Sequence, residues 1–164
     1  MTQQELWQKI LEADAIGIRL EVIGGVPTWE TMPAIRHQRE VDRIRSSIQP
    51  LESGACKCVH FADIYVRFKD GSLKRPDVSI FCQEPLELDE AVTTIPGAVI
   101  EVVSKDYEAK DYDLAPGFYV AQGVKDIIVF DPRTLVVLHV RADGATRHVS
   151  PTRITLEMGC EVTV

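Results

Sequence analysis

Two short apolar runs on either side of a helical segment constrain the fold of this chain most strongly. They are GAVIEVV at residues 97–103 and VKDIIVFDP at residues 124–132. Each is rich in β-branched residues, which predicts a buried strand. A helix over the intervening residues 104–123 makes this unit a crossover, the usual connection between two parallel strands. We therefore expect a sheet that contains at least one parallel pair.

The other elements predict antiparallel strands beside that pair and helices on its faces. Helical spacing of apolar residues runs from Gln3 to Ala13 and again over residues 33–49, and Gly24–Gly25 predicts a hairpin between them. Further strands are expected at residues 58–68, 77–82 and 134–141, and in two short terminal segments. Pro116–Gly117 is expected to kink or delay the helix after residue 104. The predicted class is α/β (or α+β), a mixed central sheet flanked by helices in one domain over residues 1–164.

The charge distribution argues against a protein that simply coats nucleic acid. The net charge is −7; residues 76–164 contain 7 Lys/Arg and 15 Asp/Glu, whereas residues 1–75 are close to neutral. A sequence-nonspecific nucleic-acid binder normally shows the opposite sign over its contact face. An acidic site that holds divalent cations and acts on phosphates is compatible with this balance.

Composition and hydropathy predict a soluble cytoplasmic protein. The hydrophobic share of 45% and the charged share of 26% are typical of a globular domain. No apolar run approaches the roughly 20 residues that a membrane-spanning helix needs. The polar, amphipathic start of the chain has no signal-peptide core. We expect no membrane partner.

Two acids occur in core-type strands. Asp77 opens the run DVSIFC, and Glu101 stands between Ile100 and Val102 in GAVIEVV. Adjacent strands lie about 4.8 Å apart, so if these two pair, both carboxylates reach one cation. Mg²⁺ is typically held by one or two carboxylates, waters and substrate phosphates. The sequence therefore favours Asp77 and Glu101 as ligands of a divalent metal.

Structural roles for these acids stay open beside the metal site. Asp77 follows a proline, so its side chain could cap a turn or pair with Lys74 or Arg75. Glu101 could form a buried pair with a lysine, because an unpaired carboxylate between apolar residues is costly.

The motifs RPDVSIF, AVIEVVS, Asp111, Tyr119, GVKDIIVFDP and VVLHV resemble, in this order, the PD-(D/E)XK restriction-endonuclease-like superfamily. They are most similar to its Uma-type (Uma-two) family. RLEVIGG resembles that family's N-terminal hairpin, and IRHQREVDRI resembles its histidine-bearing helix, so the likeness covers nearly the whole chain. The resemblance implies a nuclease-type fold, Mg²⁺ (or Mn²⁺) on Asp77 and Glu101, and, by analogy, a homodimer. Glu21 is a candidate auxiliary acid, or else a solvated strand residue.

The sequence departs from this family where a lysine is expected. The superfamily's usual lysine position holds Val103, and the Uma-type position, four residues before Tyr119, holds Ala115. Lys105 and Lys110 are the two substitutes that the sequence offers for orienting the attacking water. Either is otherwise an ordinary exposed lysine.

Several neighbouring polar residues have a functional and a structural interpretation. Ser104 could bind a ligand or cap the following helix, with the cap favoured. Arg36 and Arg39, together with Arg43, could contact phosphates or form a solvated helix face. His37 shares the apolar stripe of its helix, which favours a core histidine, and Tyr119 is expected to pack.

The four cysteines are expected to be free thiols. Cys82 and Cys160 lie in apolar, strand-like runs, where cysteine behaves as a small hydrophobe. Cys56 and Cys58 form a CxC near His60, and a metal site there is the less favoured alternative.

Two functions are consistent with these features of the sequence. The first is a Mg²⁺-dependent nuclease acting on DNA or RNA, with Asp77 and Glu101 as metal ligands. The second is a catalytically impaired or inactive protein of the same fold that serves as a binding or assembly module. The retained acids favour the first, and the missing lysine and the acidic balance favour the second.

Overall fold

The computed structural model describes residues 1–30, 34–105 and 110–164, without the side chains of Lys110 and Asp111. Its helices are α1 (Gln3–Ala15), α2 (Ile35–Ser47), a π-helical turn (Lys110–Leu114) and α3 (Ala115–Ala121). Its first strands are β1 (Arg19–Ile23), β2 (Val26–Glu30), β3 (Gln49–Pro50), β4 (Val59–Ala62), β5 (Val66–Arg67), β6 (Leu73–Lys74) and β7 (Val78–Phe81). The later strands are β8 (Ala98–Val102), β9 (Asp126–Phe130), β10 (Val136–Arg141), β11 (Gly144–Val149), β12 (Arg153–Thr155) and β13 (Cys160–Thr163).

A six-stranded mixed sheet forms the centre of the molecule, in the order β11-β10-β9-β8-β7-β4. The pair β8–β9 is parallel, and the other pairs of this sheet are antiparallel. The π-helical turn and α3 lie between β8 and β9 in the chain, as a crossover requires. The prediction of a mixed central sheet with one helix-connected parallel pair is confirmed.

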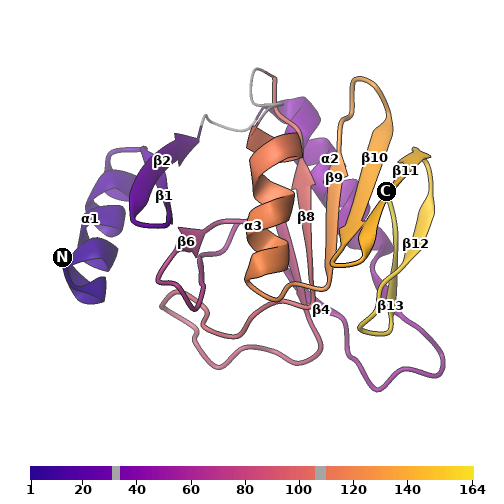
Figure 1. The fold of residues 1–164 in the computed structure, drawn as a ribbon, viewed down its shortest axis with the longest axis horizontal. Helices are drawn as coiled ribbons and strands as arrows, with labels where there is room; N and C mark the ends of the chain where they lie inside the picture. The colour runs from indigo at the N-terminus through magenta and orange to yellow at the C-terminus, as the bar shows by residue number, and fades with distance from the viewer. Residues whose placement is uncertain (31–33, 106–109) are drawn as a thin grey trace.

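Helices cover both faces of this sheet (Figure 1). On one face, Val41 and Ile44 of α2 pack with Val78, Ile100 and Ile128. On the other face, Tyr119 of α3 packs against side chains of β8 and β9, namely Val99, Ile127 and Val129. Alternate residues of β8 thus face opposite layers, which follows from the period of two in a strand. Because both faces are covered, β8 and β9 read as continuous apolar runs.

A second unit, seen at the indigo end of Figure 1, is formed by α1 and the β1–β2 hairpin. It belongs to a four-stranded sheet of order β2-β1-β6-β5. Helix α1 begins with a capping box, in which Thr2 and Glu5 each accept a hydrogen bond from the other's backbone N–H. Ile10 packs with Val22 and Leu73 in a core of its own.

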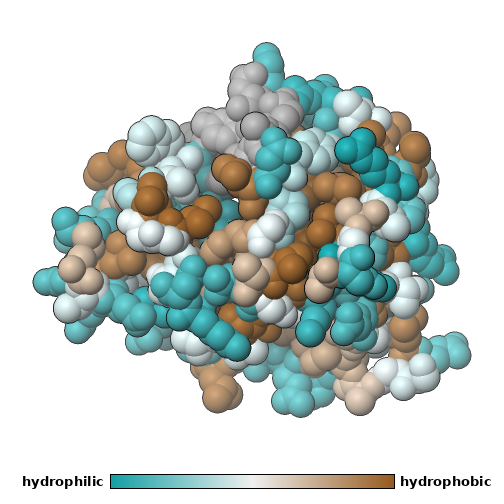
Figure 2. All heavy atoms as spheres, viewed as in Figure 1, coloured by the Kyte–Doolittle hydropathy of each residue, from teal (hydrophilic) through white to brown (hydrophobic). Residues whose placement is uncertain are grey.

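On the face shown in Figure 2, hydrophobic side chains gather over α3 and the adjacent strands, between hydrophilic side chains on either side. Leu114 of the π-helical turn is exposed. Four side chains are partly buried around the core that contains Tyr119, namely Phe118, Val120, Leu138 and Val140.

The described part of the chain contains no helix with the length and hydropathy of a membrane span.

One expectation about the strands needs correction. The apolar run at residues 58–68 was expected to be one strand, but it forms β4 and β5 in different sheets, with Asp63 between them at a φ of 58°. The helix after residue 104 is delayed, as the Pro116–Gly117 pair suggested: α3 begins at Ala115 with the proline in its first turn, where no N–H is needed. The expected helix start at Pro33 lies outside the described residues.

The prediction of free thiols is wrong. Cys56 is bonded to Cys82, and Cys58 is bonded to Cys160. His60 is directed elsewhere, because its Nδ1 accepts a hydrogen bond from Arg45. Burial, followed by the nearby Arg45 charge, lowers the pKa of His60 below its ordinary value.

The start of β9 is held by a buried carboxylate. Asp126 accepts hydrogen bonds from His139 Nε2 at 2.7 Å, Arg141 Nε at 2.6 Å and the Glu157 backbone N–H at 2.7 Å. Burial raises the pKa of Asp126, but these bonds outweigh it and the net shift is downward. The carboxylate therefore ties β9 to β10 and to the turn before β13.

We predict that Asp126→Ala lowers the free energy of unfolding by about 2–3 kcal/mol, because it leaves buried donors without their acceptor. A depressed carboxyl pKa contributes stability above the unfolded value and loses it as the pH falls. The difference in free energy of unfolding between wild type and variant should therefore narrow as the pH falls below 3.8, the ordinary pKa of an aspartate. Urea denaturation at several pH values measures this, with Asp89→Ala, at an exposed loop position, as control. Equal stabilities of wild type and Asp126→Ala at neutral pH would contradict the assignment.

Candidate active site

The register of β7 and β8 brings Asp77 and Glu101 together. These strands pair antiparallel with Val78 opposite Ile100, so the next cross-strand position sets Asp77 opposite Glu101. The Asp77 backbone N–H donates to Glu101 Oε2 at 3.4 Å. The expectation that the two acids lie on neighbouring strands is confirmed; their role as metal ligands stays a prediction.

Asp77 is oriented by two donors from different elements. The backbone N–H of Val102, at the end of β8, donates to Asp77 Oδ2 at 2.7 Å, and His37 Nε2 of α2 lies 3.0 Å from the same oxygen. His37 and Asp77 are 11% and 19% exposed, so the pair is largely shielded from water. The open alternative of pairing with Lys74 or Arg75 is not what forms: Arg75 binds Asp63, and Lys74 binds Glu21.

His37 therefore does more than the apolar stripe of its helix indicated. The stripe correctly placed its ring toward the sheet, where Val41 and Ile44 are buried. Asp77, just before the start of β7, lies against that face, so the ring contacts a carboxylate as well as apolar side chains. Spacing along α2 carried no sign of this, because it does not show which strand end lies beneath the helix.

Glu101 is buried, at 7% exposed, and is held by Tyr119 of α3. The Tyr119 hydroxyl donates to Glu101 Oε1 at 2.5 Å. Burial, followed by the neighbouring negative charge of Glu101, raises the pKa of Tyr119 well above its ordinary value. Tyr119 therefore stays protonated and remains a donor to the carboxylate, in addition to the packing role expected for it.

A buried ion pair lies beside this tyrosine. Lys74 Nζ donates to Glu21 Oε2 at 3.1 Å, and both side chains are almost fully buried. The Arg75 backbone N–H donates to Glu21 Oε1 at 2.7 Å. Lys74 Nζ also lies 5.4 Å from the centroid of the Tyr119 ring, within cation–π range. The interpretation of Glu21 as a solvated strand residue is wrong; its role as an auxiliary acid is untested.

The structure describes both positions at which the family's lysine is replaced and one of the two substitute lysines. Val103, just after β8, and Ala115, the first residue of α3, are both buried in the apolar core that also contains Tyr119. Lys105 is exposed in a turn after β8, which ends at Val102, so the strand does not continue to carry it toward Glu101. The side chain of Lys110 lies outside the described part of the structure. The sequence offered Lys74 only as a possible partner of Asp77, whereas it pairs with Glu21.

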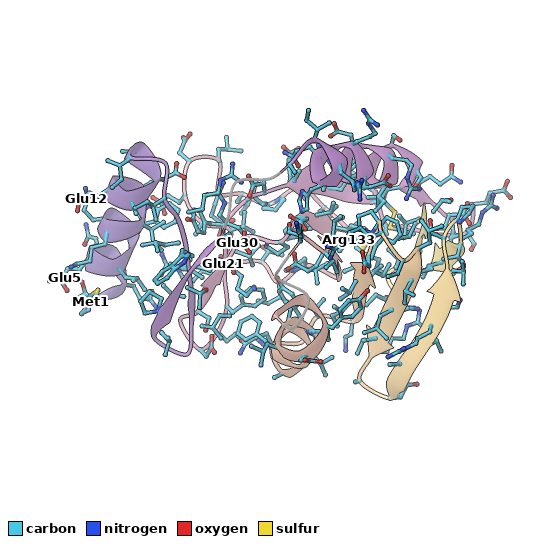
Figure 3. The ribbon with its side chains drawn as sticks, turned by 90° about the horizontal axis from the view of Figure 1, so that it is seen from above. Met1, Glu5, Glu12, Glu21, Glu30 and Arg133 are labelled. Carbon is cyan, nitrogen blue, oxygen red and sulfur yellow. A yellow bond between two sulfur atoms is a disulfide. The ribbon has the colours of Figure 1, made fainter. Side chains whose placement is uncertain are left out.

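A pocket of about 360 Å³ adjoins the acids through His37. Its lining includes three cationic side chains, Arg36, Lys105 and Arg133, together with Ser104. Figure 3 labels Arg133, beyond the end of β9, and Glu21 and Glu30 on the β1–β2 hairpin. Clustered cations in a concave surface attract anions even when the whole protein is acidic. Arg39 is exposed and is not among the residues that line this pocket.

We predict that stability at high pH depends on Tyr119. A group with a raised folded-state pKa contributes stability that is complete below its unfolded pKa and is lost as the pH rises. The free energy of unfolding of the wild type should thus fall above pH 10.0, the ordinary tyrosine value. Tyr119→Phe removes this contribution, so its curve should fall less steeply in alkaline chemical denaturation. Parallel curves for the two proteins would show that Tyr119 is not shielded as described.

Comparison with known proteins places the chain in a family. A model of the Uma2 family, described as "putative restriction endonuclease", matches residues 6–162. A solved structure from Anabaena variabilis, described as a "putative nuclease belonging to DUF820", is similar with a TM-score of 0.64 and 20% identity. That similarity covers 83% of this chain and 80% of the other, and it confirms the nuclease-like fold. The comparison with curated proteins found no match.

The family match spans the hairpin with Glu21, the helix with His37, and the strands with Asp77 and Glu101. It agrees with the resemblance drawn from the sequence motifs. This chain belongs to the Uma2 family.

Proposed function

We propose that this protein is a divalent-metal-dependent phosphodiesterase acting on nucleic acid, with Asp77 and Glu101 as ligands of Mg²⁺ or Mn²⁺. The observation that carries the proposal is the position of these two acids opposite each other across β7 and β8, where the Asp77 backbone N–H reaches Glu101 Oε2 at 3.4 Å. Membership of a family described as restriction endonucleases supports the nuclease class.

The donor set fits a hard cation. Two carboxylates from adjacent strands offer oxygen ligands and leave room for waters and a substrate phosphate, the usual surroundings of Mg²⁺. When bound, such an ion polarises the scissile phosphate and lowers the pKa of the attacking water.

The neighbouring residues hold both carboxylates in place. His37 and the Val102 N–H fix one oxygen of Asp77, and the Tyr119 hydroxyl fixes one oxygen of Glu101. Partners of this kind orient ligands and tune their basicity.

We assign to Lys74 the positive charge that the family's usual lysine positions no longer supply. Val103 and Ala115 are buried in an apolar cluster, whereas Lys74 lies against the ring of Tyr119, which binds Glu101. A fixed cation that Tyr119 separates from Glu101 would favour negative charge that develops on the phosphate. The burial of Lys74 holds its ammonium group in one position.

Phosphate binding is assigned to the pocket beside His37. Arg36 comes from α2, Lys105 from the turn after β8, and Arg133 from the turn after β9. Arg133 Nε also lies 3.7 Å from Asp131 Oδ1, and Arg36 and Lys105 add cations from two other segments of a chain whose net charge is −7. A local cluster of cations supports the approach of a phosphate to an acidic protein, because the local field governs that approach.

We expect Asp77→Asn and Glu101→Gln each to reduce nuclease activity about a hundredfold or more, because several kcal/mol of transition-state stabilisation by the metal would be lost. Nicking of supercoiled plasmid and cleavage of single-stranded DNA and RNA, each with Mg²⁺ or Mn²⁺, measure this. Glu84→Gln, at an exposed position, is the matched control. Absence of metal-dependent cleavage in the wild type on all substrates would favour the non-catalytic binding module instead.

We expect Lys74→Met to lower the free energy of unfolding by about 3–5 kcal/mol, because the buried carboxylate of Glu21 loses the ammonium group that pairs with it. Adding Glu21→Gln should restore most of that stability. The folded double variant then tests the chemical role of the pair apart from stability: its nuclease activity should stay at least about tenfold below that of wild type. Lys69→Met, an exposed lysine, is the control. Full activity in the folded double variant would limit Lys74 to a structural role.

A further inference from the structure

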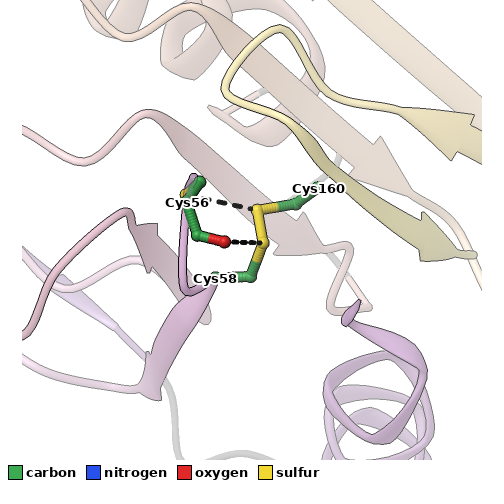
Figure 4. Close-up of side chains that lie close together, drawn as sticks. All are labelled: Cys56, Cys58 and Cys160. Atoms are coloured by element: carbon green, nitrogen blue, oxygen red, sulfur yellow. Dashed lines mark hydrogen bonds between the residues drawn. A yellow bond between two sulfur atoms is a disulfide. The ribbon is translucent and has the colours of Figure 1, made fainter. Parts of the chain in front are cut away.

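Two adjoining disulfides bring together four cysteines from three segments that are far apart in the sequence. Cys56 and Cys58 lie in the loop between β3 and β4, Cys82 follows β7, and Cys160 begins β13. Figure 4 shows Cys56, Cys58 and Cys160 converging, with the Cys58–Cys160 disulfide between two of them. This cluster plays no part in the acid site.

The sulfur atoms of the two disulfides adjoin one another. Cys56 Sγ lies 3.6 Å from Cys160 Sγ, and the sulfurs of Cys56, Cys58 and Cys160 all lie within 4.8 Å of one another. The fourth sulfur, of Cys82, is bonded to Cys56. In a tetrahedral zinc site with Zn–S bonds of about 2.3 Å, the sulfurs are about 3.8 Å apart. Three of the sulfurs thus already lie near the spacing of a tetrathiolate zinc site, and the fourth, of Cys82, is next to them through its bond to Cys56.

Three of the four cysteines are buried, as ligands of a structural site usually are, and Cys82 lies at the surface. Cys56, Cys58 and Cys160 are 7%, 4% and 0% exposed. The loop that carries the CxC has no regular structure over residues 51–58, and backbone bonds from Leu51 to Gly159 and from Lys57 to Cys82 hold it against the other segments. A metal bound by all three segments would fix this loop, the end of β7 and β13 together. Thiolates prefer Zn²⁺, whereas the oxygen ligands of the acid site prefer Mg²⁺.

We propose that, in the reduced protein, Cys56, Cys58, Cys82 and Cys160 bind one Zn²⁺ as a structural tetrathiolate site. Two equivalents of a dithiol reduce the two disulfides, supplying four electrons and four protons and becoming two disulfides themselves. The resulting four thiols release four protons when the zinc binds, and each thiolate donates one electron pair to the metal. The site is independent of the proposed nuclease function, because it shares no residue with it.

Metal content of the reduced chain tests this site directly. The full-length protein is reduced with a dithiol without oxygen, incubated with Zn²⁺, freed of excess metal and reductant by gel filtration, and assayed for zinc per chain. We expect one equivalent, and we expect Co²⁺ in its place to give the thiolate charge-transfer and tetrahedral d–d absorption bands of a CoS₄ centre. The Zn²⁺-loaded reduced protein should also melt at a higher temperature than the metal-free reduced protein.

Matched variants separate this site from other sources of metal. Cys58→Ser and Cys160→Ser should lose the bound zinc and the cobalt bands. Asp77→Asn and His60→Ala should keep one equivalent, because neither residue belongs to the four-sulfur cluster. Circular dichroism establishes whether the cysteine variants fold; if they do not, exposed Cys82→Ser provides the same test through loss of the tetrathiolate cobalt spectrum. A reduced wild type without stoichiometric zinc, or zinc that survives in folded cysteine variants, would overturn the proposal.

Discussion

The cross-strand pairing of Asp77 with Glu101 is the interaction on which the rest of this structure depends. Two carboxylates next to each other in a largely buried place repel one another and lose hydration, so each needs donors of its own. The structure provides them from different layers: His37 from α2, the Val102 N–H from β8 and Tyr119 from α3. The helices on both faces of the sheet are thereby tied to one point.

A second buried pair connects the N-terminal unit to that point. Glu21 lies in β1 and Lys74 in β6, and they are joined at 3.1 Å. Lys74 in turn lies against the ring of Tyr119. A buried ion pair is weak support for stability, since apolar residues of the same volume serve as well. Tyr119 contacts both Lys74 and Glu101, and this closeness to the acid site favours a functional reason for the buried ion pair.

The sequence predicted the parts of the site that depend on strand pattern and register. Asp77 and Glu101 stood out because an acid in an apolar strand is unusual, and a crossover unit required β8 to be a central strand. Lys74 and His37 did not stand out. Their significance depends on which side chains lie opposite across the sheet or under a helix, and periodicity along one segment does not encode that.

The cysteines illustrate the same limit. Each was interpreted from its own segment, as a small hydrophobe or as part of a short CxC, and zinc-finger spacing was absent. The fold brings residues 56, 58, 82 and 160 together through the pairing of β4 with β7 and of β3 with β13. Contacts between residues as far as 104 positions apart are fixed by topology and cannot be read from spacing.

Direct binding of Mn²⁺ to the oxidised protein tests the central claim most simply, because it does not depend on finding the right nucleic-acid substrate. Isothermal titration of the wild type should show saturable binding at the two acids, and Glu101→Gln should abolish it while Glu90→Gln, at an exposed position, leaves it unchanged. Wild-type protein that binds no Mn²⁺, or binding that Glu101→Gln leaves intact, would contradict the account of Asp77 and Glu101 as a metal site.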